Sequence, residues 1–235
     1  MIENYTYQGE ELDLFRHAKR WKSYYAAKLA PYIKGDVLEV GAGIGGTAPF
    51  LRTPATTSWT CLEPDARLLA TLENALRARP LGVPVHARHG TVSTLAADER
   101  FDTVLYIDVL EHIEEDHSEL RRASARLRPG GCLIVLAPAH NFLFSEFDKA
   151  VGHFRRYSRK TLLAAAPPGL PLVRAFYLDS IGMFASLMNR AVLKASSPTI
   201  GQIQFWDTWI IPTSKLIDPL VGYAAGKTVI AVWKR

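Results

Sequence analysis

Val37-Leu-Glu-Val-Gly-Ala-Gly-Ile-Gly-Gly46 is the stretch of this 235-residue chain that decides its fold. The residues up to Val40 have the apolar character of a buried strand, and glycines follow directly. Glycine suits such a turn because the backbone there takes φ angles that other residues avoid, and because a ligand can lie against bare backbone. A helical pattern begins near Thr47. The stretch therefore predicts a ligand-binding turn between a buried strand and a helix.

Strand-like and helical segments alternate on both sides of this turn. We expect strands at 36–40, 57–62, 101–107 and 132–137, and helices at 66–77 and 109–127. An amphipathic helix is expected at 10–33, with Pro31 and Gly35 at its end. Strands separated by helices imply right-handed crossovers and a parallel sheet covered on both faces.

The pattern changes after Pro138. An aromatic and basic stretch runs to Tyr157, and a short helix at 159–166, a strand at 172–178 and a last strand at 227–233 follow. A hydrophobic insertion occupies 180–220. The prediction is an α/β, Rossmann-like, doubly wound and mostly parallel seven-stranded sheet with an N-terminal helix and a C-terminal helical cap insertion. We expect one domain over 1–235, with a ligand-binding core at 36–138 and substrate or cap segments at 139–160 and 180–220.

Composition sets broad limits on function. Hydrophobic residues make up 48% of the chain and charged residues 22%, which is typical of a globular protein and excludes disordered and fibrous classes. The net charge of +5 permits an anionic partner but does not indicate nucleic acid. Cys61 and Cys132 lie in apolar runs, so we expect two core thiols and a reducing, cytoplasmic setting. No signal peptide or membrane span is predicted.

Two carboxylates indicate the charge of the ligand. Gly41, Gly43 and Gly46 have G-x-G-x-x-G spacing, which also fits a dinucleotide site. However, Glu39 precedes the loop by two residues and would repel a pyrophosphate, whereas it would favour a ligand with an ammonium and a sulfonium group. Glu63 ends the next strand, where a carboxylate can accept both hydroxyls of a ribose. Together they favour a positively charged nucleoside.

With these residues the sequence resembles the class I S-adenosylmethionine-dependent methyltransferases, over 36–138 and at the last strand. The resemblance implies S-adenosylmethionine as cofactor and S-adenosylhomocysteine as product. It also implies that the glycine loop holds the methionine portion and that the acid after the second strand binds the ribose. These roles fall on Glu39, Gly41, Gly43, Gly45 and Glu63. Thr91 stands in the loop where the family usually has an acidic residue near the adenine, and it offers a hydroxyl there.

A second match lies in Phe101-Asp-Thr-Val-Leu-Tyr-Ile-Asp-Val-Leu-Glu-His-Ile113. It resembles the small-molecule methyltransferases, such as the ubiquinone-pathway O-methyltransferases. The resemblance implies that Asp108, Val109 and Leu110 border the methionine end of the cofactor. Trp21 on the first helix is expected to close over the cofactor, as N-terminal elements do in many relatives.

Three histidines, His112, His140 and His153, follow the carboxyl ends of strands, where substrate meets cofactor in an open parallel sheet. A base is required only if the acceptor arrives protonated, and a histidine near neutral pH can take that proton. We favour His153 as base or substrate contact, since its segment resembles a subgroup of bacterial methyltransferases found with glycan or specialised-metabolite enzymes. Because His140, Asp148 and His153 match no metal-ligand spacing, we predict no metal.

A basic cluster follows His153. Arg155 and Arg156, with Tyr157, are read as substrate contacts that clamp a carboxylate or phosphate, or alternatively as a solvated helix start. The two arginines point in different directions on any helix, so at most one is expected to reach the substrate.

The predicted function is methyl transfer to a small-molecule acceptor, with oxygen ahead of nitrogen or carbon. An RNA methyltransferase and a non-catalytic cofactor-binding protein stay as alternatives. The insertion at 180–220 suits an acceptor pocket, a dimer face or peripheral membrane contact, and both a monomer and a homodimer stay open.

Overall fold

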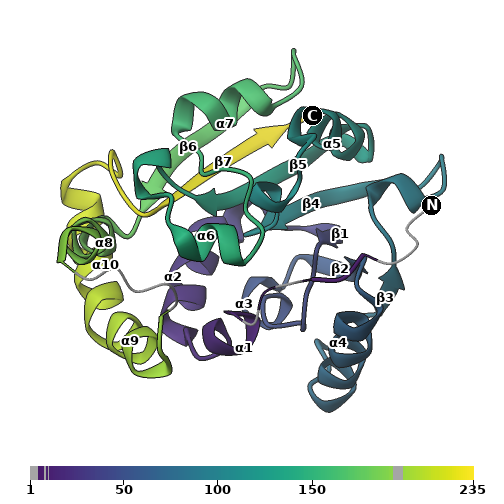
Figure 1. The fold of residues 1–235 in the computed structure, drawn as a ribbon. Coiled ribbons are helices and arrows are strands. Elements are labelled where there is room, and N and C mark those ends of the chain that lie inside the picture. The colour runs from purple at the N-terminus through teal and green to yellow at the C-terminus, as the bar shows by residue number, and fades with distance from the viewer. Residues whose placement is uncertain (1–4, 8, 10, 193–197) are drawn as a thin grey trace.

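The computed structural model describes residues 5–7, 9, 11–192 and 198–235. In these residues one seven-stranded sheet runs in the order β3-β2-β1-β4-β5-β7-β6 (Figure 1). Its strands are β1 (Gly35–Val40), β2 (Thr56–Glu63), β3 (Val85–His89), β4 (Phe101–Ile107), β5 (Leu127–Pro138), β6 (Leu172–Leu178) and β7 (Thr228–Lys234). Neighbours among β1 to β5 pair in parallel, and β7 is antiparallel to both β5 and β6. The predicted doubly wound, mostly parallel sheet is confirmed.

Helices cover both faces of the sheet. Their bounds are α1 (Glu11–Phe15), α2 (Lys19–Leu29), α3 (Ala48–Leu51), α4 (Ala66–Ala78), α5 (Asp116–Ala125), α6 (Glu146–Ala150) and α7 (Arg159–Ala165). Figure 1 shows α5 and α7 on one side and α2, α3 and α4 on the other. Successive side chains of β4 pack into two different clusters, since Leu105 joins the α2 side and Val104 and Tyr106 join the α5 side. A strand buried on both faces explains the unbroken apolar run in the sequence.

The helix predicted at 10–33 is in fact broken; residue 10 itself lies outside the described residues. A turn separates α1 from α2, and a 3-10 turn, η1 (Ala30–Tyr32), follows α2. The cause lies far away in the chain. The carboxylate of Asp207 accepts hydrogen bonds from the backbone N–H groups of Arg20 (3.0 Å) and Trp21 (2.8 Å), which satisfies the first turn of α2.

The helix predicted at 109–127 is also interrupted. A 3-10 turn, η3 (Leu110–His112), precedes α5, which begins at Asp116. Tyr157 fixes this break, because its hydroxyl donates to the carboxylate of Asp116 (2.7 Å) and to the carbonyl of Leu110 (3.3 Å). Two further 3-10 turns are η2 (Val92–Thr94) and η4 (Asn141–Leu143).

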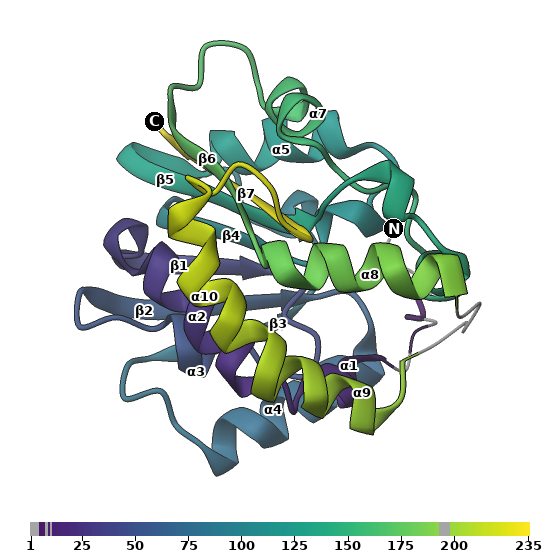
Figure 2. The same ribbon diagram turned by 90° about the vertical axis from the view of Figure 1, so that its left-hand side faces the viewer.

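The insertion forms the predicted helical cap. It contains α8 (Ser180–Val192), α9 (Ile200–Phe205), a π-helical turn η5 (Trp206–Ile210) and α10 (Ile211–Leu220), which Figure 2 shows in front of the sheet. Two buried aspartates hold it. Asp218 accepts hydrogen bonds from the hydroxyl of Tyr24 on α2 and from the backbone of Ser180. Asp179 accepts one from the indole of Trp206. Among the described residues, no helix has the length and apolar character needed to cross a membrane.

Candidate active site

A cavity of about 1150 Å³ lies where the glycine loop, the ends of β4 and β5 and the cap meet. Pockets for single small ligands span roughly 300–1,000 Å³, so this one has room for two ligands side by side. Its walls come from the N-terminal segment, the sheet edge, α6 and the cap, and they include Tyr7, Trp21, Lys22, Gly41, Gly43, Asp108, Glu111, His112, Phe147, His153, Arg156, Ile203, Trp206 and Lys227.

The glycine loop forms one wall. Gly41, Gly43 and Gly45 all have positive φ angles, of 66°, 55° and 77°, which side chains disfavour. A Cβ atom on Gly41 would lie 2.7 Å from a methyl group of Val109, so only glycine lets the loop pack this closely against that residue. Gly41 and Gly43 line the cavity, whereas Gly45 faces Leu72 of α4. The structure thus explains the loop's glycines by backbone conformation and close packing.

Glu63 ties the loop to β2. Its carboxylate accepts hydrogen bonds from the backbone N–H groups of Gly43 (2.8 Å) and Asp65 (2.9 Å). Burial raises the pKa of Glu63, and these two hydrogen bonds oppose the rise. A carboxylate has about four acceptor positions, and these bonds leave two of them unused. Glu63 is 3% exposed and lies behind the loop, next to Gly43, without forming part of the cavity wall.

Glu39 lies beneath the loop rather than in the cavity wall. Its side chain is buried and accepts a hydrogen bond from the indole N–H of Trp59 (2.8 Å). Burial raises the pKa of Glu39 to about 7, against the effect of that hydrogen bond. Lys22, which donates to the carbonyl of Gly46 (3.0 Å), adds a nearby positive charge. Any influence of Glu39 on a ligand is therefore electrostatic, without direct contact.

Asp108 is a carboxylate that lines the cavity beside the glycine loop. It follows β4 directly and has a positive φ of 53°, which turns the chain abruptly at the sheet edge. Burial raises the pKa of Asp108 to about 6, while the charges of His153 and Lys22 favour its ionised form. Asp108, unlike Glu39, is therefore placed to contact a ligand in the cavity.

Of the other cofactor candidates, only Trp21 lines the cavity. Leu110 is fully buried in the core, and Val109 supports Gly41 from behind. Thr91 caps its own turn by accepting a hydrogen bond from the backbone of Ser93, and it lies outside the cavity wall.

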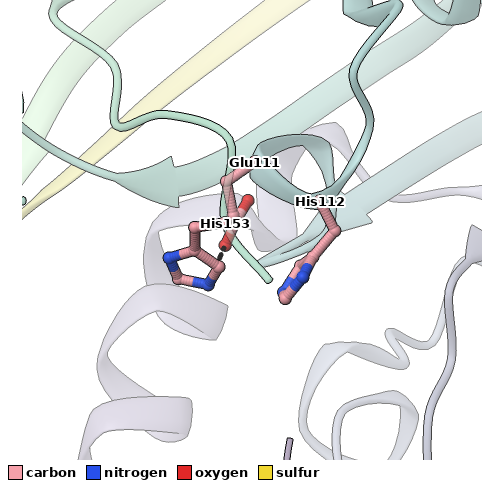
Figure 3. A group of neighbouring side chains, drawn as sticks. All are labelled: Glu111, His112 and His153. Carbon is pink, nitrogen blue, oxygen red and sulfur yellow. Dashed lines mark ion pairs between the residues drawn. The ribbon is translucent and has the colours of Figure 1, made fainter. Parts of the chain in front are cut away.

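Figure 3 shows the side chains of Glu111, His112 and His153 close together, and all three line the cavity, as Asp108 does. The imidazole rings of His112 and His153 meet edge to face, with centroids 4.5 Å apart. Nδ1 of His153 lies 2.8 Å from a carboxylate oxygen of Asp148, and its Nε2 lies 4.0 Å from Oε1 of Glu111. The backbone N–H of Phe154 donates to the carbonyl of Glu111 (2.8 Å), which holds the His153 segment against η3.

Burial shapes the protonation of this group. It lowers the pKa of His112 to about 3, with a further contribution from His153, so this imidazole is neutral at physiological pH. It raises the pKa of Glu111 well above its usual range, and the neighbouring Asp108 adds to that effect. Oε2 of Glu111 is buried and has no hydrogen-bond partner.

Two further candidates, His140 and Tyr157, do not line the cavity. His140 has a positive φ of 66° and stacks between Phe142 and Tyr177, with ring centroids 4.8 and 5.0 Å away, so it does not line the cavity. Tyr157, expected to contact substrate, is instead buried and pins η3 to α5.

The side chains of Arg155 and Arg156 point in different directions. Arg155 points away and pairs with Asp116 at 2.7 Å, whereas Arg156 lines the cavity. Both hydrogen bonds of the Arg156 guanidinium go to the buried carboxylate of Asp148 (2.7 and 2.9 Å), so Arg156 is not a free anion clamp. Burial opposes ionisation of Asp148, but the hydrogen bonds from His153 and Arg156 hold its pKa well below the usual range.

Sequence reasoning missed Glu111 and Lys227 as cavity residues. Glu111 stood inside the quoted Asp-Val-Leu-Glu-His segment, next to His112, and that adjacency was the available signal. Lys22 follows Trp21 on α2, and Lys227 precedes β7. Nothing in the local sequence shows that these two segments meet.

Comparisons with known proteins agree with this geometry. Residues 38–133 match a family model described as "Methyltransferase domain". A ubiquinone biosynthesis O-methyltransferase of Paramagnetospirillum magneticum is 45% identical over 104 residues, which are 44% of this chain and 40% of the relative. The corresponding protein of Azorhizobium caulinodans is 47% identical over 113 residues, 47% of this chain and 43% of the relative. The matches thus span less than half of these relatives.

Solved structures share the fold over nearly the whole chain. Coclaurine N-methyltransferase, bound to N-methylheliamine and S-adenosylhomocysteine, aligns over 93% of this chain and 72% of its own, with a TM-score of 0.62 and 16% identity. A putative sarcosine dimethylglycine methyltransferase from Galdieria sulphuraria aligns over 99% and 92%, with the same TM-score and identity. At this identity the likeness concerns the fold alone.

Proposed function

We propose that this chain is a class I S-adenosylmethionine-dependent methyltransferase and that it transfers a methyl group to an oxygen of a small molecule bound in the cavity. The observation that carries the proposal is the juxtaposition, in one cavity, of the glycine loop, the carboxylate of Asp108 and the imidazole of His153. The first two suit a cationic nucleoside, and the third suits an acceptor that must lose a proton.

The residues present fit the cofactor. Gly41 and Gly43 offer bare backbone, Asp108 offers negative charge to a positively charged ligand, and Glu63 has acceptor positions left for ribose hydroxyls. Glu39 adds negative charge from below the loop. S-adenosylmethionine, when bound, supplies a methyl group on a positively charged sulfur.

His153 is proposed as the base that takes the proton of the acceptor hydroxyl. Asp148 engages its Nδ1 at 2.8 Å, which orients the ring and leaves Nε2 on the side of Glu111 and the cavity. As the acceptor oxygen attacks, its bond to the methyl carbon forms and the carbon–sulfur bond breaks, and the hydroxyl proton passes to Nε2. Aligned binding and exclusion of water supply much of the rate enhancement in such a displacement.

The cap supplies an apolar wall for the acceptor. Ile203, Phe205 and Trp206 line the cavity from above, and Phe144 and Phe147 line it from the α6 side. Since Arg156 is already paired with Asp148, an anionic group has no free guanidinium to meet there. The proposed acceptor is therefore a hydroxyl-bearing small molecule with a substantial apolar part.

Two measurements test the proposal. S-adenosylhomocysteine should bind in a calorimeter and NAD should not; the reverse result would refute the cofactor assignment. The acceptor is then sought by incubating cell extract with isotope-labelled S-adenosylmethionine and identifying the labelled product by mass spectrometry.

Paired histidine variants test the base. His153→Gln should lower turnover by about 10²–10⁴-fold while S-adenosylhomocysteine affinity is kept. His140→Asn is the matched control, because asparagine tolerates the left-handed backbone of that position and His140 lies outside the cavity. Full turnover of His153→Gln, or an equal loss in both variants, would remove His153 from the chemistry.

A further inference from the structure

Glu111, His112 and His153 each present a ligand atom, and these atoms lie within 4.8 Å of one another (Figure 3). They come from two segments, η3 and the loop after α6, that Phe154 ties together through its hydrogen bond to Glu111. We propose that these three side chains form a binding site for a divalent transition-metal ion at the wall of the cavity. Two imidazoles and one carboxylate with open positions beside them are a recurrent metal-binding set.

One oxygen of the buried Glu111 side chain lacks a partner. Its side chain is only 1% exposed, and its Oε2 atom has no hydrogen-bond partner. A buried polar atom without a partner costs free energy, and a buried carboxylate without a cation costs more. A bound cation would satisfy this oxygen.

The three ligand atoms lie slightly farther apart than in an occupied site. Ligand atoms about 2.1 Å from one ion are about 3.0–3.4 Å apart at octahedral or tetrahedral angles. His153 Nε2 and Glu111 Oε1 are 4.0 Å apart, and no two of the three atoms are more than 4.8 Å apart. Side-chain rotations that move these atoms by about 1 Å would bring them to an ion.

Supporting groups orient both imidazoles. Asp148, which is fully buried, engages Nδ1 of His153 and leaves Nε2 toward Glu111. A carboxylate behind a ligating histidine is a regular feature of metal sites, because it fixes the ring and makes its other nitrogen a better ligand. The ring of His112 packs between those of Tyr7 and His153, with ring centroids 5.4 and 4.5 Å away.

The donor set also selects the ion. Imidazole nitrogens suit Zn²⁺, Mn²⁺ or Co²⁺, whereas Mg²⁺ prefers oxygen ligands. Because all three residues line the cavity, the open positions face the space assigned to the acceptor.

A role for the ion in methyl transfer rests on the proposed function, whereas its binding does not. A hydroxyl coordinated at an open position loses its proton to water more readily. The resulting oxygen then forms its bond to the methyl carbon as the carbon–sulfur bond breaks. In the metal-loaded protein His153 is therefore a ligand and not the base.

Binding is tested without any acceptor. Protein stripped with a chelator and dialysed is titrated with Co²⁺, which reports its ligands by visible absorption, and with Zn²⁺ in a calorimeter. We expect one equivalent of each to bind, with affinity lowered at least tenfold in Glu111→Gln and in His153→Gln. His140→Asn should bind as the wild type does. Absence of binding at millimolar Co²⁺, or unchanged binding in Glu111→Gln, would overturn the site.

Folding and activity are read separately. Without metal, Glu111→Gln should melt no lower than the wild type, since it keeps the shape of a side chain whose Oε2 has no hydrogen-bond partner, and Zn²⁺ should raise the melting temperature of the wild type and of His140→Asn but not of Glu111→Gln. Loss of methyl transfer on chelation, restored by Zn²⁺, would support the catalytic role. Full activity of the metal-free protein would overturn that role and leave His153 as the base.

Discussion

Replacing Glu39 by glutamine should stabilise the protein at neutral and alkaline pH. The side chain is 2% exposed and accepts a hydrogen bond from the indole N–H of Trp59. A glutamine oxygen can accept the same hydrogen bond. Burial raises the pKa of Glu39 from 4.5 to about 7. The substitution therefore removes a titrating group while it keeps the shape and the hydrogen bond.

The magnitude and sign follow from that pKa. Between its unfolded and folded pKa values Glu39 holds its proton only in the folded protein, so stability falls as pH rises through this window and stays lower above it. At about 1.4 kcal/mol per pH unit, a window of roughly 2.5 units corresponds to about 3.5 kcal/mol. Glu39→Gln should match the wild type near pH 4.5 and exceed its free energy of unfolding by up to about 3.5 kcal/mol at pH 8.

Urea unfolding at pH 5 and pH 8 measures the difference. Asp36→Asn is the control of opposite sign, because hydrogen bonds from Ser58 and Thr57 lower the pKa of Asp36, so this variant should lose stability above the acidic range. If Glu39→Gln is no more stable than the wild type at pH 8, the positive charge of Lys22 compensates the buried carboxylate and the reasoning is wrong. The same variant should bind S-adenosylhomocysteine normally but S-adenosylmethionine, which carries the additional sulfonium charge, more weakly.

Three further substitutions test other parts of the structure. Glu63→Ala should weaken S-adenosylhomocysteine binding by about 1.5–3 kcal/mol in calorimetry, since a ribose would lose a charged acceptor, and an unchanged affinity would refute the ribose role. Asp207→Ala should lower the free energy of unfolding by about 1–2 kcal/mol in urea, with Asp207→Asn closer to the wild type, because the first turn of α2 loses its cap. Gly182→Ala places a Cβ atom 2.0 Å from Oδ2 of Asp179, so its melting temperature should fall; a variant as stable as the wild type would contradict the packing at the base of the cap.

Local patterns predicted the strands and the glycine loop because their causes are local. A strand buried on both faces is an apolar run, and a turn with positive φ angles needs glycine. The interruptions of the two long helices have distant causes. Asp207 caps a helix that begins near residue 19, and Tyr157 fixes a break near residue 113. No window of sequence around either break contains its cause.

The candidate site also contains residues with local causes, which the sequence predicted, and residues placed by distant contacts. Gly41, Gly43 and Glu63 follow from the order of strand, loop and strand, and the structure places them together. His140 and His153 both follow the fifth strand, and the sequence favoured His153 only through the resemblance of its segment. The left-handed backbone of His140 and its aromatic neighbours direct it away from the cavity, whereas the hydrogen bond from Phe154 to the η3 carbonyl brings the adjacent His153 in.

The basic residues after β5 show how much the fold changes the meaning of a charge pattern. In the sequence, Arg155 and Arg156 stand without an acidic neighbour and suggest a clamp for an anionic substrate. In the fold, Arg155 meets Asp116 and Arg156 meets Asp148, so both guanidiniums are neutralised by buried or nearly buried carboxylates. Removing one partner of a buried pair costs about 3–5 kcal/mol, which applies to Arg156 and Asp148, whereas Arg155 is partly exposed and its pair with Asp116 contributes less. Both arginines hold η3 and the His153 segment in place, and under the proposed function the apolar cap is the part that recognises the acceptor.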